Sequence, residues 1–189
     1  MNQPVTTNIV GRKINTYTLA ITAVMTAITC VLAPMSIPIG AVPISFTNLA
    51  IYLSLYLLGC KMGTVSYVVY IFIGMVGMPV FSGFSGGLGK LLGPTGGYII
   101  GFIPMAIISG IVIDKFEKRI LQFLAMVTGT VVCYVFGTVW FCFVMDSTAI
   151  AALNICVFPF IPGDIAKIAI AITVGPMLRN QLSKARLLA

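Results

Sequence analysis

The chain has 189 residues, of which 59% are hydrophobic and only 8% are charged. A soluble domain with so few charges would not stay in solution, so the composition indicates an integral membrane protein in a lipid bilayer. The net charge of +7 does not indicate a nucleic-acid partner, because the basic residues lie in short clusters beside apolar segments, where they orient membrane proteins. Histidine is absent, which removes the commonest metal ligand and the usual general base. We therefore expect no enzyme activity, metal site or cofactor.

The first apolar segment follows Arg12 and Lys13 and extends over about 14–33. Twenty helical residues cover about 30 Å, enough to cross the hydrocarbon. The segment is longer than a signal-peptide core and lacks a typical cleavage site, so we interpret it as the first transmembrane helix. Ala23 and Ala27 form a small-xxx-small pair on it. By spacing alone, this pair fits either contact with another protein or packing within the bundle.

The next part of the chain, 34–78, contains a proline-rich loop and two short apolar arms. Three prolines in 34–43 predict an extended, non-helical loop. The arms lie at about 45–58 and 63–78, and residues 59–62 separate them. They are either two spans or one re-entrant hairpin, and in both cases the chain returns to the side it left. Lys61 at the turn favours two spans.

A glycine-rich segment, 74–101, interrupts the apolar sequence with more than half of the nineteen glycines. Lipid-exposed irregular backbone is not tolerated, because each unsatisfied N–H or C=O costs several kcal/mol in hydrocarbon. The segment must therefore lie outside the hydrocarbon or line a cavity. A flexible connector is the simpler interpretation, but the segment is longer than a hairpin needs. We favour a loop that closes over a ligand.

Three further spans are expected, at about 96–113, at 120–145, and from near Asp164 to about Leu182, with an irregular connection over 146–162. The predicted fold is therefore all-α, a single transmembrane domain of six transmembrane helices over residues 1–189, with the glycine-rich loop between helices three and four. Of eleven Lys and Arg residues, all except Lys90 and Lys167 fall on one side of this topology. The positive-inside rule then places both termini in the cytoplasm and the irregular loops at the outer face of the cell membrane.

Asp164 and Lys167 are the candidate charged groups of an outer pocket. They are three residues apart and share a helix face. A charge at the centre of a span costs roughly 2.5–3.5 kcal/mol on insertion scales, so charges near spans suggest function. Alternatively, Asp164 caps the helix N-terminus while Lys167 snorkels or pairs with it. Lys167 is harder to explain in this way, because a cation near a helix N-terminus opposes the dipole.

Neutral hydrogen-bonding groups and aromatic walls are expected around these charges. The polar candidates are Thr47, Asn48, Ser85, Thr95 and Tyr98, and the aromatic candidates are Phe46, Phe81, Phe84 and Phe158.

Four segments carry a resemblance to a known family: AVPISFT at 41–47, GMPVFSG at 77–83, LGPTGGY at 92–98 and PGDIAK at 162–167. They resemble the BioY family, the biotin-specific substrate-binding subunits (S components) of energy-coupling factor (ECF) transporters. The resemblance covers essentially the whole chain. It implies a six-helix S component that binds biotin from outside and docks on a transmembrane T component with two cytosolic ATPases. The family's AxxxA docking motif corresponds to Ala23 and Ala27.

The chemistry of the candidate residues fits biotin, the transported substrate. Asp164 can accept hydrogen bonds from the ureido N–H groups, whereas Lys167 can donate to the ureido oxygen or pair with the carboxylate. The sequence leaves both roles of Lys167 open. The alternatives are a self-sufficient carrier or channel, which the lack of a charge relay disfavours, an intramembrane enzyme, and an S component for another vitamin.

Overall fold

The computed structural model describes residues 16–38 and 42–184. Arg12, Lys13, Arg186 and the first two residues of the predicted first span lie outside these ranges. The described elements are α1 (Thr16–Leu32), β1 (Ser36–Ile37), β2 (Ile44–Ser45), α2 (Thr47–Met75), α3 (Leu88–Leu92), α4 (Gly96–Lys115), α5 (Arg119–Met145), α6 (Ala149–Cys156) and α7 (Ile161–Lys184).

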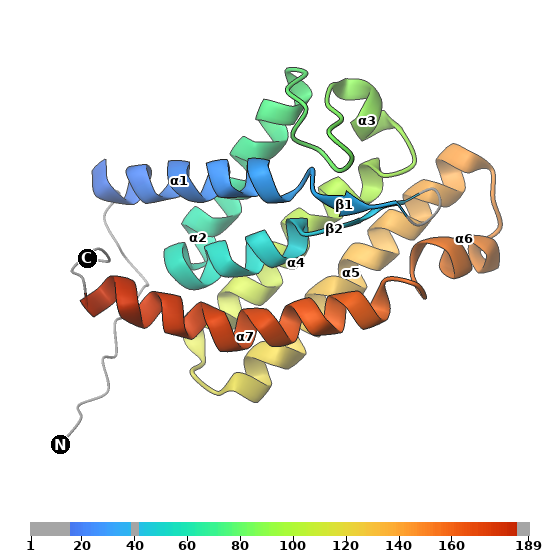
Figure 1. The fold of residues 1–189 in the computed structure, drawn as a ribbon. Coiled ribbons are helices and arrows are strands. Elements are labelled where there is room, and N and C mark those ends of the chain that lie inside the picture. The colour runs from blue at the N-terminus through green and yellow to red at the C-terminus, as the bar shows by residue number, and fades with distance from the viewer. Residues whose placement is uncertain (1–15, 39–41, 185–189) are drawn as a thin grey trace.

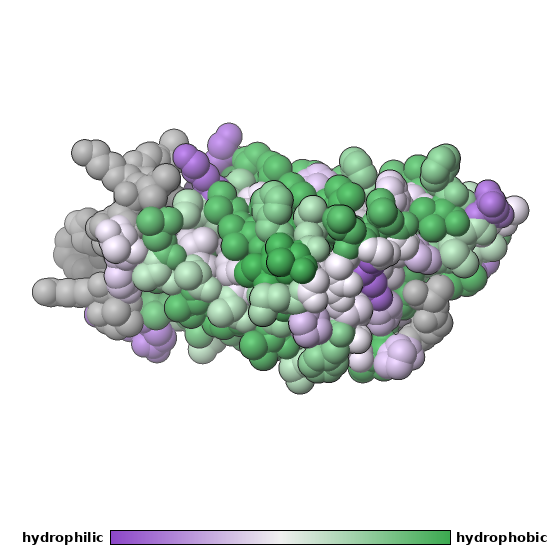
Figure 2. Space-filling model, turned by 90° about the horizontal axis from the view of Figure 1, so that it is seen from above, coloured by the Kyte–Doolittle hydropathy of each residue, from purple (hydrophilic) through white to green (hydrophobic). Residues whose placement is uncertain are grey.

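Four of the described helices, α2, α4, α5 and α7, are long and apolar enough to cross a membrane, and α1 is a shorter apolar helix of 17 residues. The bounds of α1, α4 and α5 agree closely with the predicted spans. Figure 2 shows a broad hydrophobic band across one face of the molecule, with strongly hydrophilic residues mainly towards its two ends. This distribution is that of a multi-pass membrane protein.

Helix α2 is divided into two arms by Gly59, whose φ of 77° and ψ of 176° are non-helical. Glycine tolerates a positive φ because it has no Cβ. The Asp114 carboxylate of α4 accepts a hydrogen bond of 2.8 Å from the Cys60 backbone N–H, which satisfies one donor at the start of the second arm. The predicted turn over 59–62 is therefore too long. The reversal takes place at one residue, and Lys61 already lies inside the second arm.

The loops at the opposite end of the bundle contain more structure than predicted. The proline-rich loop forms the antiparallel pair β1–β2, with Ser36 opposite Ser45. The connection predicted as irregular over 146–162 contains α6, where the Thr148 hydroxyl accepts a hydrogen bond from the Ala151 N–H and caps the helix. Helix α7 begins at Ile161, three residues before Asp164 and so close to the predicted start. Pro162 is compatible with a first helical turn, where its missing N–H costs nothing.

The helices pack so that α2 contacts α1, α4 and α7, and α4 contacts α5. Helix α1, the first arm of α2 and α7 run along the same direction, with β1–β2 and α6 at one end (Figure 1). A small cluster of Met25, Leu57 and Leu58, with Ile21, Met62 and Leu182 against it, marks the opposite end. Close helix contact depends on glycine at several positions. A Cβ at Gly137 of α5 would overlap the ring of Tyr98 on α4.

Candidate functional site

A cavity of about 60 Å³ lies at the β1–β2 end of the bundle. A single water needs roughly 10–15 Å³ measured in this way, so there is space for more than one. Its lining comes from residues 42–45, α2, the loop after α2, α4 with the residue before it, α5, the last residue of α6, and α7 with the residue before it. It is therefore a junction of elements distant in sequence, the usual setting for a small-molecule site.

Asp164 and Lys167 form a buried ion pair in this cavity. The Lys167 ammonium lies 3.0 Å from Oδ1 of Asp164, and the two side chains are 9% and 10% exposed. Lys167 also donates a 2.7 Å hydrogen bond to the backbone oxygen of Ser45 at the end of β2. This pairing satisfies the condition for burying charges, which are costly unless paired and hydrogen-bonded.

Two neutral side chains complete the environment of Asp164. The Asn48 amide of α2 donates to Oδ1 at 2.9 Å, and the Tyr134 hydroxyl of α5 donates to Oδ2 at 2.6 Å. The Asp164 backbone N–H already donates to Phe160 within the helix. No hydrogen bond from a helix N-terminal amide to the Asp164 carboxylate is present among the described residues. The capping interpretation of Asp164 is therefore wrong.

The network leaves one donor and one acceptor position free on these two charged groups. An ammonium has three N–H donors, and Lys167 uses two of them. A carboxylate oxygen accepts about two hydrogen bonds, so Oδ1 is saturated by Asn48 and Lys167, whereas Oδ2 accepts from Tyr134 alone among the described residues. The site can thus offer one N–H and one lone pair, on two paired side chains, to a ligand.

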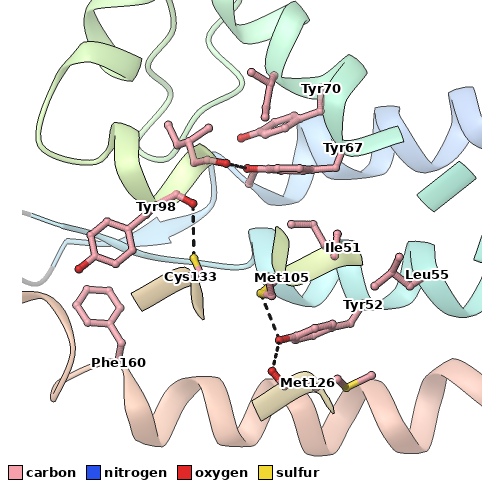
Figure 3. Packing of buried hydrophobic residues seen from close by; sticks show 14 of the residues in the cluster. Ile51, Tyr52, Leu55, Tyr67, Tyr70, Tyr98, Met105, Met126, Cys133 and Phe160 are labelled. Atoms are coloured by element: carbon pink, nitrogen blue, oxygen red, sulfur yellow. Dashed lines mark hydrogen bonds between the residues drawn. The ribbon is translucent and has the colours of Figure 1, made fainter. Parts of the chain in front are cut away.

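Aromatic rings form the apolar walls of the cavity. Tyr67 and Tyr70 of α2 stack with ring centroids 5.4 Å apart, and Phe102 and Phe81 pack edge-on against them. The tyrosine hydroxyls donate to the backbone oxygens of Ile99 and Val80 and are thereby satisfied. Figure 3 shows the stacked pair, together with Tyr98 and Phe160. The walls can therefore contact an apolar ligand body.

Seven of the eleven candidate residues line the cavity: Thr47, Asn48, Phe81, Thr95, Tyr98, Asp164 and Lys167. The Thr95 hydroxyl is buried and has no hydrogen-bond partner among the described residues. Phe46, Phe84 and Ser85 are not in the lining, and neither is Phe158. Phe84 has a φ of 53° and is 70% exposed, and Ser85 hydrogen-bonds to Ser82 within the loop. The prediction of these side chains as pocket walls is not supported by their position.

Sequence reasoning missed Tyr134, Tyr67, Tyr70 and Phe160, which all line the cavity. Tyr134 lies in the mainly apolar sequence of α5, where Thr130 and Thr138, four residues before and after it, share its helix face. A tyrosine within a predicted span was the available signal, since its hydroxyl requires a partner when it is buried.

The alanines predicted as a docking pair lie far from the cavity lining, on an exposed face of α1. Ala23 and Ala27 are both exposed, whereas the threonines Thr18, Thr22, Thr26 and Thr29 face the bundle. The Thr26 and Ser66 hydroxyls hydrogen-bond between α1 and α2 at 2.9 Å. Packing of the alanines within the described bundle is therefore excluded.

These features define a helical membrane protein with a polar-lined, aromatic-walled ligand pocket at one end. The sequence profile of the BioY family matches residues 4–184. The chain belongs to the BioY family.

Relatives from other organisms are similar to most of the chain. The biotin transporter BioY of Thermotoga maritima is 34% identical over 83% of this chain and 92% of its own length. The probable biotin transporter BioY of Pyrococcus horikoshii is 35% identical over 85% of this chain and 95% of its own length. Among solved structures, the S-component for biotin from an ECF-type ABC transporter aligns with a TM-score of 0.80 and 30% identity, covering 86% of this chain and 90% of that chain. These relatives are transporters and not enzymes.

Proposed function

We propose that this protein is the biotin-binding membrane subunit of an ECF-type uptake transporter and that biotin binds in the cavity around Asp164 and Lys167. The observation that carries this proposal is the buried Asp164–Lys167 pair inside an aromatic-walled cavity, in a chain whose relatives are biotin transporters. No cofactor is required, because biotin is the transported substrate.

We assign the ureido group of biotin to the charged end of the cavity. A ureido ring has a carbonyl oxygen directly beside N–H groups, so it needs one donor and one acceptor that lie next to each other. The free N–H of Lys167 and the free lone pair on Oδ2 of Asp164 supply this combination. The tyrosine pair then faces the apolar bicyclic ring. In this assignment Lys167 donates to the ureido oxygen of biotin, and the carboxylate of biotin lies away from Lys167.

Six membrane crossings follow if the two arms of α2 each count as one. Together with α1, α4, α5 and α7 they give six apolar arms. Both described ends of the chain then lie at the end of the bundle marked by Met62 and Leu182. The positive-inside rule makes this end cytoplasmic and opens the cavity to the outside.

Energy for uptake must come from partners. We propose that the exposed Ala23 and Ala27 face of α1 docks on the T component, which is coupled to two cytosolic ATPases. Association of helices in lipid depends on close packing of small residues, and these alanines are exposed on the described chain.

Equilibrium binding of labelled biotin to the purified protein tests the proposed substrate. Saturable binding at a stoichiometry of one, competed by unlabelled biotin and reduced by a change at Lys167, is the expected result. A matched control is Lys184→Ala, which removes an exposed lysine at the far end of α7. Absence of binding at micromolar biotin would overturn the proposal.

A further inference from the structure

A second depression lies on the lipid-facing surface, between the second arm of α2 and α4, and shares no residue with the ligand cavity. Its lining includes Lys61, Thr64, Val65, Val69 and Phe72 of α2 and Ile107 of α4. The α2 residues recur at three- or four-residue spacing and so follow one face of the helix. The four apolar side chains are 41–58% exposed. The depression is therefore an apolar groove along the helices.

Basic residues lie at one end of this groove only. Lys61 is exposed at the start of the second arm of α2. The hydrogen bond from Cys60 to Asp114 places the end of α4 at the same level, so the next residue, the exposed Lys115, also lies at this depth. Two cations and one carboxylate, that of Asp114, therefore lie at this depth. Positive charge is in excess among these three groups, which makes this end of the groove attractive to an anion.

The hydroxyl of Thr64 lies about one helical turn further along α2 than Lys61. The Thr64 hydroxyl is buried and has no hydrogen-bond partner among the described residues. Thr64 lines the groove, and threonine in a helix populates two χ1 rotamers, so this hydroxyl is a candidate donor to a ligand oxygen in the groove. From Lys61 to Phe72 the helix rises by about 16 Å, close to half of the roughly 30 Å hydrocarbon thickness. The groove thus has the depth of one leaflet.

We propose that this groove is a binding site for one anionic phospholipid. The phosphate is paired with Lys61 and Lys115, a glycerol ester oxygen accepts from Thr64, and one acyl chain lies along Val65, Val69, Phe72 and Ile107. The order of cations, hydroxyl and apolar groove matches the order of phosphate, ester and acyl chain. In the proposed topology this is the cytoplasmic leaflet, whose lipids attract basic juxtamembrane residues.

A second protein helix fits this groove less well than a lipid chain does. Helices in membranes approach closely where small residues meet, as on the alanine face of α1. The groove is lined instead by three valines, a phenylalanine and an isoleucine, together with Cys60, Lys61 and Thr64. The branched and aromatic side chains hold a helix backbone at a distance. A flexible acyl chain can follow such an irregular surface.

Native mass spectrometry of the purified full chain in detergent, titrated with phosphatidylglycerol or phosphatidylcholine, tests this site. We expect the wild type to retain one phosphatidylglycerol with roughly ten- to thirtyfold preference over phosphatidylcholine, since each lysine near the headgroups contributes about tenfold at most. The double change Lys61→Ala and Lys115→Ala should abolish this preference, and Val69→Trp should reduce retention of both lipids by filling the groove.

The matched controls are Lys184→Ala, at the end of α7, and Val131→Trp, on the exposed face of α5. Both should bind like the wild type, and thermal unfolding should show that all variants remain folded. Equal retention of the two lipids by the wild type, or a preference that survives the double lysine change, would overturn the proposal. A wild-type dimer that Val69→Trp dissociates would also overturn it, because the groove would then be an interface between copies.

Discussion

The hydroxyl of Tyr134 donates a 2.6 Å hydrogen bond to Oδ2 of Asp164, joining α5 to α7 inside the cavity. Hydrogen bonds to charged groups contribute about 1.5–3 kcal/mol, more than those between neutral groups. Together with Asn48, this contact fixes the orientation of the carboxylate and leaves one lone pair of Oδ2 for a ligand. Tyr134 therefore positions the acceptor that we assign to the ureido group.

Replacing Tyr134 with Phe should lower biotin affinity about tenfold, equivalent to roughly 1.4 kcal/mol, because the carboxylate loses its fixed orientation. Isothermal titration calorimetry provides the measurement. Tyr56→Phe is the matched control: its buried hydroxyl donates to Oε1 of Gln122 at 2.8 Å, and neither of these residues lines the cavity. That variant should lose stability but keep its affinity. Equal affinities for Tyr134→Phe and the wild type would show that the tyrosine has no positioning role.

The charged pair itself can be tested by separating its structural role from its binding role. Asp164→Asn or Lys167→Met alone leaves a buried charge without its partner, which typically costs about 3–5 kcal/mol of stability. The double variant removes both charges and should recover much of that stability, yet it should not bind biotin. Thermal unfolding and biotin binding measured on all three proteins give the answer. A stable double variant with normal affinity would mean that the pair is purely structural.

Some parts of the site could be predicted from sequence because they contrast with their surroundings. Asp164 and Lys167 were identifiable since charges are rare in so apolar a chain. Tyr134 was not, because it carries no charge and only the fold reveals which α5 residues face Asp164. Phe84 was wrongly placed in the wall because composition does not indicate in which direction a loop side chain points.

The fold likewise has features that the sequence predicts and features that it does not. Hydrophobic length sets the bounds of α4 and α5 within a few residues. The prolines near α6 led to the prediction of an irregular connection. The structure has a short helix there, which the Thr148 side chain caps. The reversal at Gly59 was placed correctly along the chain but given too many residues, because a single residue with positive φ is not distinguishable from a short glycine-containing turn.

The contact between α5 and α4 next to the cavity depends on the absence of a side chain at Gly137. Gly137→Ala should displace Tyr98, whose ring occupies that space, and so weaken both stability and biotin binding. Gly163→Ala is the matched control, since a Cβ there meets no atom within 4 Å. It should be neutral, or stabilising by up to about 1 kcal/mol because alanine favours a helix. Thermal unfolding and biotin binding distinguish the two, and identical behaviour would contradict the packing argument.

Bulky substitutions on the exposed face of α1 should abolish transport but leave biotin binding unchanged. Ala23→Trp or Ala27→Trp should leave biotin affinity of the isolated protein normal, because neither residue lines the cavity. Transport and co-purification with the T component and ATPases should both be lost, since a bulky side chain prevents close helix packing. Val131→Trp on α5 is the control for a bulky exposed residue. Full transport by Ala27→Trp would exclude this docking face.

Hydrogen exchange can test whether the glycine-rich loop closes over the ligand. Residues 80–92 contain Gly83 and Gly87 at positive φ, and Phe81 in this loop lines the cavity. Ligand contact should restrict this backbone, so we expect slower exchange over 80–92 with biotin bound. Residues 120–130 of α5 serve as an internal reference. Unchanged exchange in the loop would indicate a rigid pocket without a lid.

The break in α2 sets the width of the cavity from its far end. Asn48, on the first arm, and Tyr70, on the second, both line the cavity, and each lies eleven residues from Gly59 in the sequence. Each of these two residues therefore lies about 16 Å from Gly59 along its arm, and the arms meet at Gly59 without an intervening loop. A change of about 10° between them would move their ends apart by roughly 3 Å, the size of a water molecule. The backbone angles of Gly59 thus set the angle between the two arms, and this angle determines how far apart the polar and the aromatic sides of the binding site lie.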